Sequence, residues 1–166
     1  YTEVNGVLFN KEKTVLHIYP RGKTGANYTI PDSVTIIERN AFSSCTRLTS
    51  INIPDGVTSI EGNAFYKCNS LTSITIGADV TSIEKSAFYA CTSLTSITIP
   101  DSVTSIGQWA FYACTSLTAV TFLGDAPKEG KEVFKDSALT IYRKPEAKGW
   151  GDKWSDRPVK LISEKP

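Results

Sequence analysis

The sequence has no excess of charge of one sign and no long apolar run. Its 166 residues include 18 lysines and arginines against 17 aspartates and glutamates, and a single histidine. Because a balanced charge creates no long-range field toward phosphates or anionic lipids, we expect no nucleic-acid partner. No stretch approaches the roughly 20 apolar residues that a membrane-spanning helix needs, so no transmembrane segment is predicted.

Methionine is absent as well, and the N-terminus carries no secretory signal. The residues after Tyr1 do not show the basic stretch followed by an apolar stretch that marks a signal peptide. We therefore expect the chain to be a mature or excised fragment of a longer precursor.

Cysteines are few, but they recur at a constant interval. Cys45, Cys68, Cys91 and Cys114 are spaced 23 residues apart, and each lies in the same template, I-P-D-x-V-T-x-I-x-x-x-A-F-x-x-C-x-x-L-T-x-I-x. A fixed period of about 20 to 50 residues is typical of solenoids, in which each coil buries its apolar face against its neighbours. The sequence therefore predicts one solenoid domain, residues 1–166.

Within a coil, alternation of apolar and polar residues predicts short parallel strands. Ile51 and Ile53 flank Asn52, and the pattern repeats one and two periods later. Pro54 with the next two residues favours a turn out of the strand. A coil of 23 residues that contains proline leaves no room for a long helix, so we expect mainly β structure with at most single helical turns.

The first and middle parts of the chain differ in pattern. Residues 1–29 hold two apolar runs, Val7–Phe9 and Val15–Tyr19, around a polar turn, which predicts a β-hairpin that caps the first coil. Residues 30–121 hold four regular repeats.

Beyond these repeats the template decays. Residues 122–142 form a degenerate terminal repeat, with Glu129 where isoleucine is expected and Ser137 where cysteine is expected. Residues 143–166 form a C-terminal capping tail, whose tryptophans we expect to close the far end of the core.

The motif I-P-x-x-V-x-x-I-x-x-x-A-F-x-x-C-x-x-L, from Ile30 to about Tyr142, resembles the BspA-like, or Treponema-type, leucine-rich repeat of 23 residues. The resemblance implies secreted or cell-surface proteins of host-associated anaerobic bacteria, some of which are adhesins. It supplies no catalytic residues and no cofactor. We therefore expect an extracellular or cell-surface, non-enzymatic protein, and a right-handed leucine-rich-repeat solenoid as its fold.

The four cysteines could in principle bind zinc or form disulfides. Equivalent residues of a solenoid lie in a row about 4.8 Å apart, and a row does not surround one ion tetrahedrally. Parallel side chains are also poorly oriented for a disulfide dihedral. We expect the cysteines to be small buried apolar side chains, and no metal site.

The single histidine, His17, lies between Leu16 and Ile18 in the predicted hairpin. Alternation places Leu16 and Ile18 inward and His17 outward. A catalytic arrangement would need a second element brought to His17, and the cysteines are predicted to be buried. No catalytic residue is expected.

Strand residues that face away from the core form a first candidate binding surface. We call this set the sheet face: Ser50, Asn52, Ser73, Thr75, Ser96, Thr98 and Thr121. It is polar and uncharged. It is either a recognition surface for a protein or glycan ligand, or a row of soluble strand-forming residues that binds nothing.

Aromatic residues form a second candidate, which we call the tyrosine stripe: Tyr66, Tyr89, Tyr112 and the nearby Trp109. Stacked tyrosines could bind a protein or a sugar, or they could only stabilise the stack of coils. The corresponding alternatives for function are an adhesion module and a passive spacer within a larger surface protein.

Overall fold

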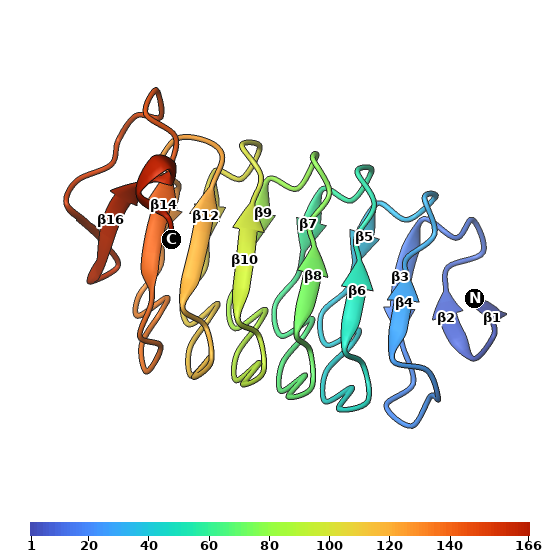
Figure 1. Ribbon diagram of the computed structural model, residues 1–166. Helices are drawn as coiled ribbons and strands as arrows, with labels where there is room; N and C mark the ends of the chain where they lie inside the picture. The colour runs from blue at the N-terminus through green and yellow to red at the C-terminus, as the bar shows by residue number, and fades with distance from the viewer.

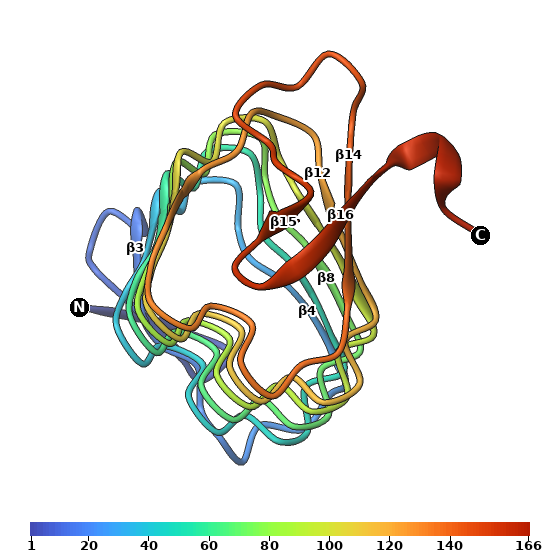
Figure 2. The ribbon, with the colours of Figure 1, turned by 90° about the vertical axis from the view of Figure 1, so that its left-hand side faces the viewer.

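The computed structural model describes all residues, 1–166, as a mainly β solenoid (Figure 1). Its one helical element is a short 3₁₀ turn near the C-terminus, η1 (Ile162–Glu164). Successive coils stack with equivalent residues in register, as the end-on view shows (Figure 2). The predicted fold class is confirmed, with parallel strands and almost no helix.

One row of strands runs along the sheet face, and all of them except the last are parallel. Ser50 pairs with Ser73, and Ser96 with Ala119, which are the same positions of successive repeats. The row consists of two separate sheets. In order, they contain β4 (Asn27–Thr29), β6 (Ser50–Asn52) and β8 (Ser73–Thr75), then β10 (Ser96–Ile99), β12 (Ala119–Phe122), β14 (Thr140–Arg143), β16 (Arg157–Leu161) and β15 (Lys153–Trp154).

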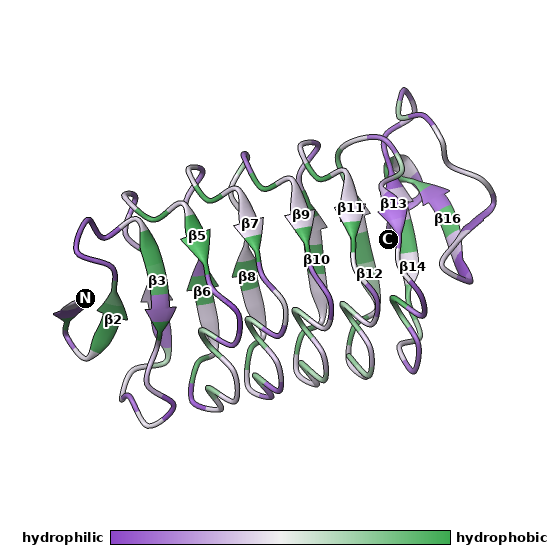
Figure 3. Ribbon diagram, turned by 180° about the vertical axis from the view of Figure 1, so that it is seen from behind, coloured by the Kyte–Doolittle hydropathy of each residue, from purple (hydrophilic) through white to green (hydrophobic).

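A second row of strands lies on another side of each coil and is unbroken (Figure 3). The strands pair in parallel from the N-terminal end to the degenerate repeat. In order, they are β3 (Val15–Ile18), β5 (Ile36–Ile37), β7 (Ser59–Ile60), β9 (Ser82–Ile83), β11 (Ser105–Ile106) and β13 (Lys128–Glu129).

The N-terminal hairpin extends this second row. Strand β2 (Val7–Phe9) pairs antiparallel with β3, as the sequence predicts, and β1 (Thr2–Val4), which the sequence pattern did not reveal, adds a further antiparallel strand. A bulge shifts the pairing, since Leu8 opposes Ile18 while Phe9 opposes Leu16. The extra residue, His17, resets the alternation. The inward placement of Ile18 was therefore wrong: its exposed fraction is 54%, whereas Leu16 is fully buried.

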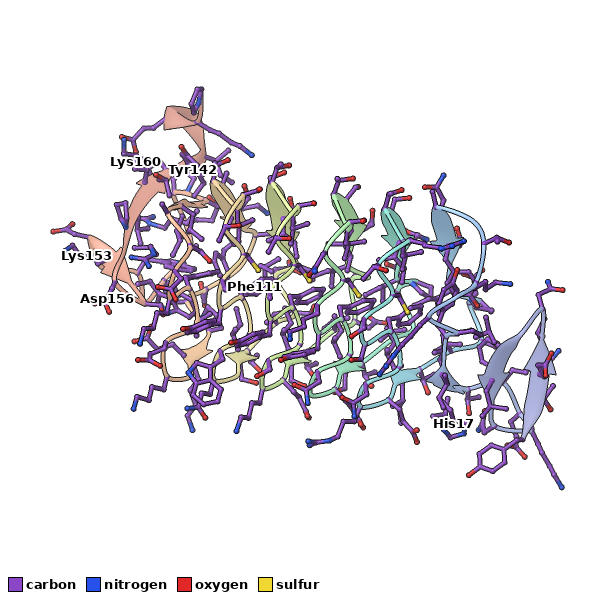
Figure 4. The ribbon with its side chains drawn as sticks, turned by 90° about the horizontal axis from the view of Figure 1, so that it is seen from below. His17, Phe111, Tyr142, Lys153, Asp156 and Lys160 are labelled. Carbon is purple, nitrogen blue, oxygen red and sulfur yellow. The ribbon has the colours of Figure 1, made fainter.

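The core is one continuous apolar cluster that extends from Val7 to Trp154. The isoleucines of the repeats that alternation assigned inward are buried, and the phenylalanines of the Ala-Phe turns stack in a column through the centre of the solenoid. Figure 4 shows Phe111 within this interior. Each coil thus contributes one large ring and several branched side chains to a core shared with its neighbours.

The Ala-Phe segment of each coil is a chain of turns and not a helix. Ala64 donates its backbone N–H to Glu61, three residues earlier, and Cys68 donates to Phe65. Two positions per coil adopt the left-handed conformation although neither holds glycine. They are Asn40, Asn63, Ser86, Trp109 and Glu132 in the first series, and Ser44, Lys67, Ala90, Ala113 and Asp136 in the second.

The C-terminal segment closes the far end. Trp154 is buried, and its ring centroid lies 5.5 Å from that of Phe122 and 5.8 Å from that of Phe134. Its indole N–H donates to the carbonyl of Pro127. After β16 the chain turns back over the outer side of β14, ending at η1 (Figure 1).

Candidate binding face

Strands β6, β8 and β10 present the central part of the sheet face to solvent. Ser73, Thr75, Ser96 and Thr98 are exposed, as is Asn52. Ser50 is half-buried because its hydroxyl donates to the side-chain oxygen of Asn27 at 2.7 Å. The surface offers hydroxyl and amide groups and no ionisable side chain, which suits a neutral, hydrogen-bonding ligand.

The predicted face is wrong at its C-terminal end. Thr121 is only 8% exposed, because the C-terminal segment folds over β12 and β14. The Lys165 ammonium donates to the Thr121 hydroxyl at 3.3 Å and lies 5.8 Å from the ring centroid of Tyr142. Figure 4 shows Tyr142 beneath this segment, next to Lys160. The tail has no repeat pattern, so its path was not predictable from periodicity.

The face extends further toward the N-terminus than expected. Strand β4 pairs in parallel with β6, and Asn27 and Thr29 are exposed beside Ser50 and Asn52. The signal for this strand was present in the sequence, since Tyr28-Thr29-Ile30-Pro31, which leads into the first repeat, matches the strand-to-turn part of the template.

The sheet face is interrupted between β8 and β10. The two strands are neighbours in the row but belong to separate hydrogen-bonded sheets, and Figure 1 shows a wider spacing there than between the other strands. A cavity of about 410 Å³ lies at this break. Its lining is Thr72, Ser73, Ile74, Thr75, Ile76, Ser96, Ile97, Thr98, Pro100 and Leu123. We call this cavity the slot.

The tyrosine stripe forms a stacked column on another side of the coils. The centroid distance is 5.0 Å between Tyr66 and Tyr89 and 4.9 Å between Tyr89 and Tyr112, with nearly parallel rings in the second pair. The Lys67 ammonium lies 5.3 Å from the Tyr66 centroid. The ring faces therefore contact one another, and the column can offer a ligand mainly ring edges and hydroxyls.

Trp109 lies beside the stripe without joining its stack. Its indole N–H donates to Glu132 at 2.8 Å, and the Lys85 ammonium is 5.0 Å from its ring. The bond from Trp109 and a second from Lys135 hold the pKa of the Glu132 carboxyl below its usual range. A hollow of about 250 Å³ is lined by Tyr89, Trp109, Tyr112, Glu132 and Lys135.

The cysteines are free and buried in a row. Each thiol donates to a backbone carbonyl of the preceding coil: Cys68 to Phe42 at 3.0 Å, Cys91 to Phe65 at 3.2 Å, and Cys114 to Phe88 at 3.1 Å. In the degenerate repeat, the Ser137 hydroxyl makes the same bond, to Phe111 at 3.0 Å. The position therefore needs a small buried donor, a requirement that the repeat pattern did not reveal.

Burial also suppresses thiol ionisation. It raises the pKa of Cys68 and of Cys114 to about 12, and that of Cys45 to about 11, where the positive charge of Arg21 partly offsets the effect. The pKa of Cys91 is raised as well, again mainly by burial. Because the thiolate is the nucleophile and the metal ligand, these are poor reactive groups in the folded chain.

His17 is half-buried and not fully outward as expected. Its Nδ1 lies 2.7 Å from the Glu38 carboxylate, and the ring of Tyr1 packs edge-on against it at 4.9 Å. Figure 4 places His17 at the opposite end of the solenoid from Lys153 and Asp156. No group of three or more His, Cys, Asp or Glu side chains is arranged so that it could hold a metal ion.

The structure contains no helix with the length and apolar character needed to cross a bilayer.

Comparison with known proteins finds similar leucine-rich repeats in bacterial proteins. The sequence pattern of the BspA type Leucine rich repeat region matches residues 22–140 in six copies. No curated protein matches the sequence. A solved structure of a leucine rich cell surface protein from Faecalibacterium prausnitzii is similar, with 35% identity and a TM-score of 0.69, over 72% of this chain and 32% of that one.

Two further structures share the fold. The leucine rich repeat protein of T. pallidum is 25% identical with a TM-score of 0.68, over 82% of this chain and 67% of that one. The pneumococcal vaccine antigen PcpA, at 24% identity, has a TM-score of 0.77 over 97% of this chain and 42% of its own. The chain thus spans less than half of the Faecalibacterium and pneumococcal structures.

Proposed function

The chain belongs to the BspA type leucine-rich repeat family, and we propose that it is a non-catalytic binding module of an extracellular or cell-surface bacterial protein. Its ligand would be a protein or glycan on a host or bacterial surface. The observation that carries this proposal is the sheet face over β6, β8 and β10, which is open, polar and free of charge.

The other surfaces support the sheet face as the proposed site, because they have less to offer a ligand. The stripe rings use their faces to stack on one another. The far end of the sheet face lies under the C-terminal segment. Between β6 and β10, by contrast, exposed hydroxyls stand beside the slot, where side chains and backbone are both within reach of a ligand.

A second candidate function is that of a passive spacer. One observation favours it: the second strand row runs without interruption from β3 to β13, which gives a stiff rod whatever the sheet face does. In that case neither surface recognises a ligand.

Binding of the immobilised chain to a panel of host matrix glycoproteins, mucins and glycans distinguishes a binding module from a passive spacer. The test variant replaces Ser73, Thr75, Ser96 and Thr98 with Glu. The matched control places four Glu residues at Thr35, Thr58, Thr81 and Thr104, exposed threonines at the same 23-residue spacing beside the other row.

Saturable binding that the test variant loses and the control retains is the expected result. Binding that survives the test variant would move the site to Tyr66, Tyr89 and Tyr112. No binding by the unmodified chain would favour the spacer.

A further inference from the structure

The backbone hydrogen bonds that join neighbouring strands are missing at the slot. In the intact part of the row, Ile53 donates its N–H to the carbonyl of Thr75 at 3.0 Å. The equivalent pair one coil later, Ile76 and Thr98, makes no such bond. At the other end of the strands, Ser73 donates its N–H to the carbonyl of Thr49 at 3.2 Å, but the equivalent bond from Ser96 to Thr72 is absent.

A side-chain ladder is interrupted at the same place. The Thr72 hydroxyl donates to the carbonyl of Thr49 at 3.1 Å, and Thr118 donates to Thr95 at 3.2 Å. The intervening bond, from Thr95 to Thr72, is absent. The corresponding ladder beside the second row runs unbroken from Thr35 through Thr58, Thr81 and Thr104.

The break is confined to one side of the coil. Strand β9 pairs with both of its neighbours, and the rings of Phe65 and Phe88 stack beneath the break. On the open side, solvent reaches the inward isoleucines: Ile74 and Ile76 are 8% and 9% exposed, against 3% for Ile51. Strands β8 and β10 can therefore move apart, with the paired second row as the hinge. No backbone hydrogen bond joins β8 to β10, so none is lost.

Gly77 explains why the coils part here. It replaces the proline of the template, and a Cβ at this position would lie 2.1 Å from the Pro54 carbonyl oxygen. The turn therefore lies closer to the preceding coil than a side chain would allow. Ala78 donates its N–H to Asp55 there at 2.9 Å, and Asp79 donates to the Asp55 carbonyl.

Two coils later the equivalent position holds Leu123, and the row is not broken there; the glycine of that turn, Gly124, comes one residue further on. Gly124 also lies close to the preceding coil, since a Cβ at this position would lie 2.7 Å from the Cα of Asp101. That turn is also held from its far side, since Trp150 donates to the Gly124 carbonyl at 3.2 Å. The Gly77 turn has only the Ser102 hydroxyl, bonded to Val80, on its far side.

The slot therefore presents two strand edges that face each other with unused donors and acceptors. Such edges are templates for an added strand. We infer that the slot accepts an extended, uncharged peptide segment of a partner protein, which pairs with β8 on one side and β10 on the other. This inference rests on the proposed binding role of the sheet face.

The lining specifies the chemistry of the peptide. Side chains that point inward would meet Ile74, Ile76 and Ile97, whereas those that point outward would lie among the hydroxyls of Ser73 and Ser96. No charged residue lines the slot. A segment that alternates apolar and hydroxyl side chains fits, and it needs the strands to move apart by one strand spacing, about 4.8 Å.

The chain's own strand supplies a probe with this pattern. The peptide Thr-Ser-Ile-Thr-Ile-Pro, the sequence of Thr95–Pro100, is labelled with a fluorophore and titrated with the intact chain. Its control carries N-methyl groups on alternate amides, which keeps the side chains but removes the donors for one edge. We expect saturable binding of the first peptide and at least tenfold weaker binding of the second.

Two variants test whether the peptide binds in the slot. Gly77→Pro restores the template residue and displaces the turn from Pro54, which should close the slot and weaken peptide binding at least tenfold. Gly56→Ser is the matched control, because it restores another repeat residue in the turn of an intact coil, where a Cβ has ordinary contacts of 3.6 Å or more. Equal peptide binding to both variants would overturn the inference.

Amide exchange followed by NMR needs no variant. In the free chain, the amides of Ile76 and Ser96 should exchange faster than those of Ile53 and Ser73, and saturating peptide should slow them at least tenfold. If the peptide binds but does not slow exchange of these amides, it is not inserted between β8 and β10, and the inference is overturned. The inference is also overturned if a neutral oligosaccharide slows their exchange and the peptide does not. If the chain binds a ligand of the panel, keeps that binding in the Gly77→Pro variant and does not bind the peptide, the slot is not the binding site. The proposed binding function would then still stand.

Discussion

Phe65 and Phe88 stack face to face, with their ring centroids 5.1 Å apart and their planes within 3° of parallel. They belong to a column that continues from Phe42 to Phe134 at spacings of 4.9 to 5.5 Å. Every ring in it is fully buried. The column joins the two halves of the solenoid where the sheet face is broken, so it carries much of the cohesion there.

Replacing Phe88 with Ala should lower the free energy of unfolding by about 3 to 5 kcal/mol, because it leaves a ring-sized cavity between Phe65 and Phe111. Urea denaturation followed by circular dichroism measures the change. Tyr89→Ala, which removes a half-buried ring from the outer column, is the control and should cost less. A loss below about 1 kcal/mol for Phe88→Ala would contradict the central role of the column.

The native chain should resist thiol reagents at pH 8, whereas the unfolded chain should react with four equivalents. Burial and raised pKa values keep the thiols protonated and inaccessible. Time-resolved labelling followed by mass spectrometry gives the order of reaction. Cys45 should react first, since its bond to the Tyr19 carbonyl is the longest of the row at 3.6 Å. Rapid labelling of Cys91 in the native chain would refute the buried row.

Stability should fall as pH rises above about 9. In that range the unfolded chain loses thiol protons, whereas the folded chain keeps them until its raised pKa values of about 11 to 12. The folded state then binds more protons, so the free energy of unfolding decreases with pH, by up to about 1.4 kcal/mol per thiol per unit.

Denaturation midpoints between pH 7 and pH 11 measure this slope. Replacing all four cysteines with Ser keeps a donor at each position, as Ser137 does naturally, and should flatten the slope. Part of the pH dependence should remain in this variant, because burial also raises the pKa values of Tyr19 and Tyr28. An unchanged slope in the variant would exclude the thiols as its source.

Ala113→Gly should stabilise the chain by about 1 kcal/mol. Ala113 is held at a φ of 55°, which a side chain disfavours and glycine adopts freely. Thermal unfolding measures the effect. Ala110→Gly, three residues earlier at a buried site with negative φ, is the control and should destabilise. Destabilisation by both substitutions would show that the left-handed position carries no strain.

The repeat period was sufficient to predict the solenoid, its parallel strands and its inward residues. Ile51, Ile74 and Ile97 recur at one position, and only stacked coils bury them all. Alternation failed where an extra residue enters a strand: the bulge at His17 turned Ile18 outward, and a bulge depends on the register of pairing with the partner strand, here β2 of the same hairpin.

Departures from the template were harder to interpret. The sequence shows that Gly77 replaces proline, but a broken ladder depends on how closely Gly77 approaches Pro54 and on what holds the turn from its other side. Similarly, Lys165 covers Thr121 through a tail that belongs to no repeat. Both depend on contacts between segments that share no pattern.

Many bonds between coils recur at the same template positions from one coil to the next, as between Thr58 and Thr35 or Thr81 and Thr58. A coil could thus be excised or duplicated between equivalent residues, such as Ile53 and Ile76, and every new junction would resemble an existing one. We expect recombination within such a gene to change the length of the rod in whole coils while the hairpin and the tryptophan end stay the same. The reach of the module would then evolve independently of its ends.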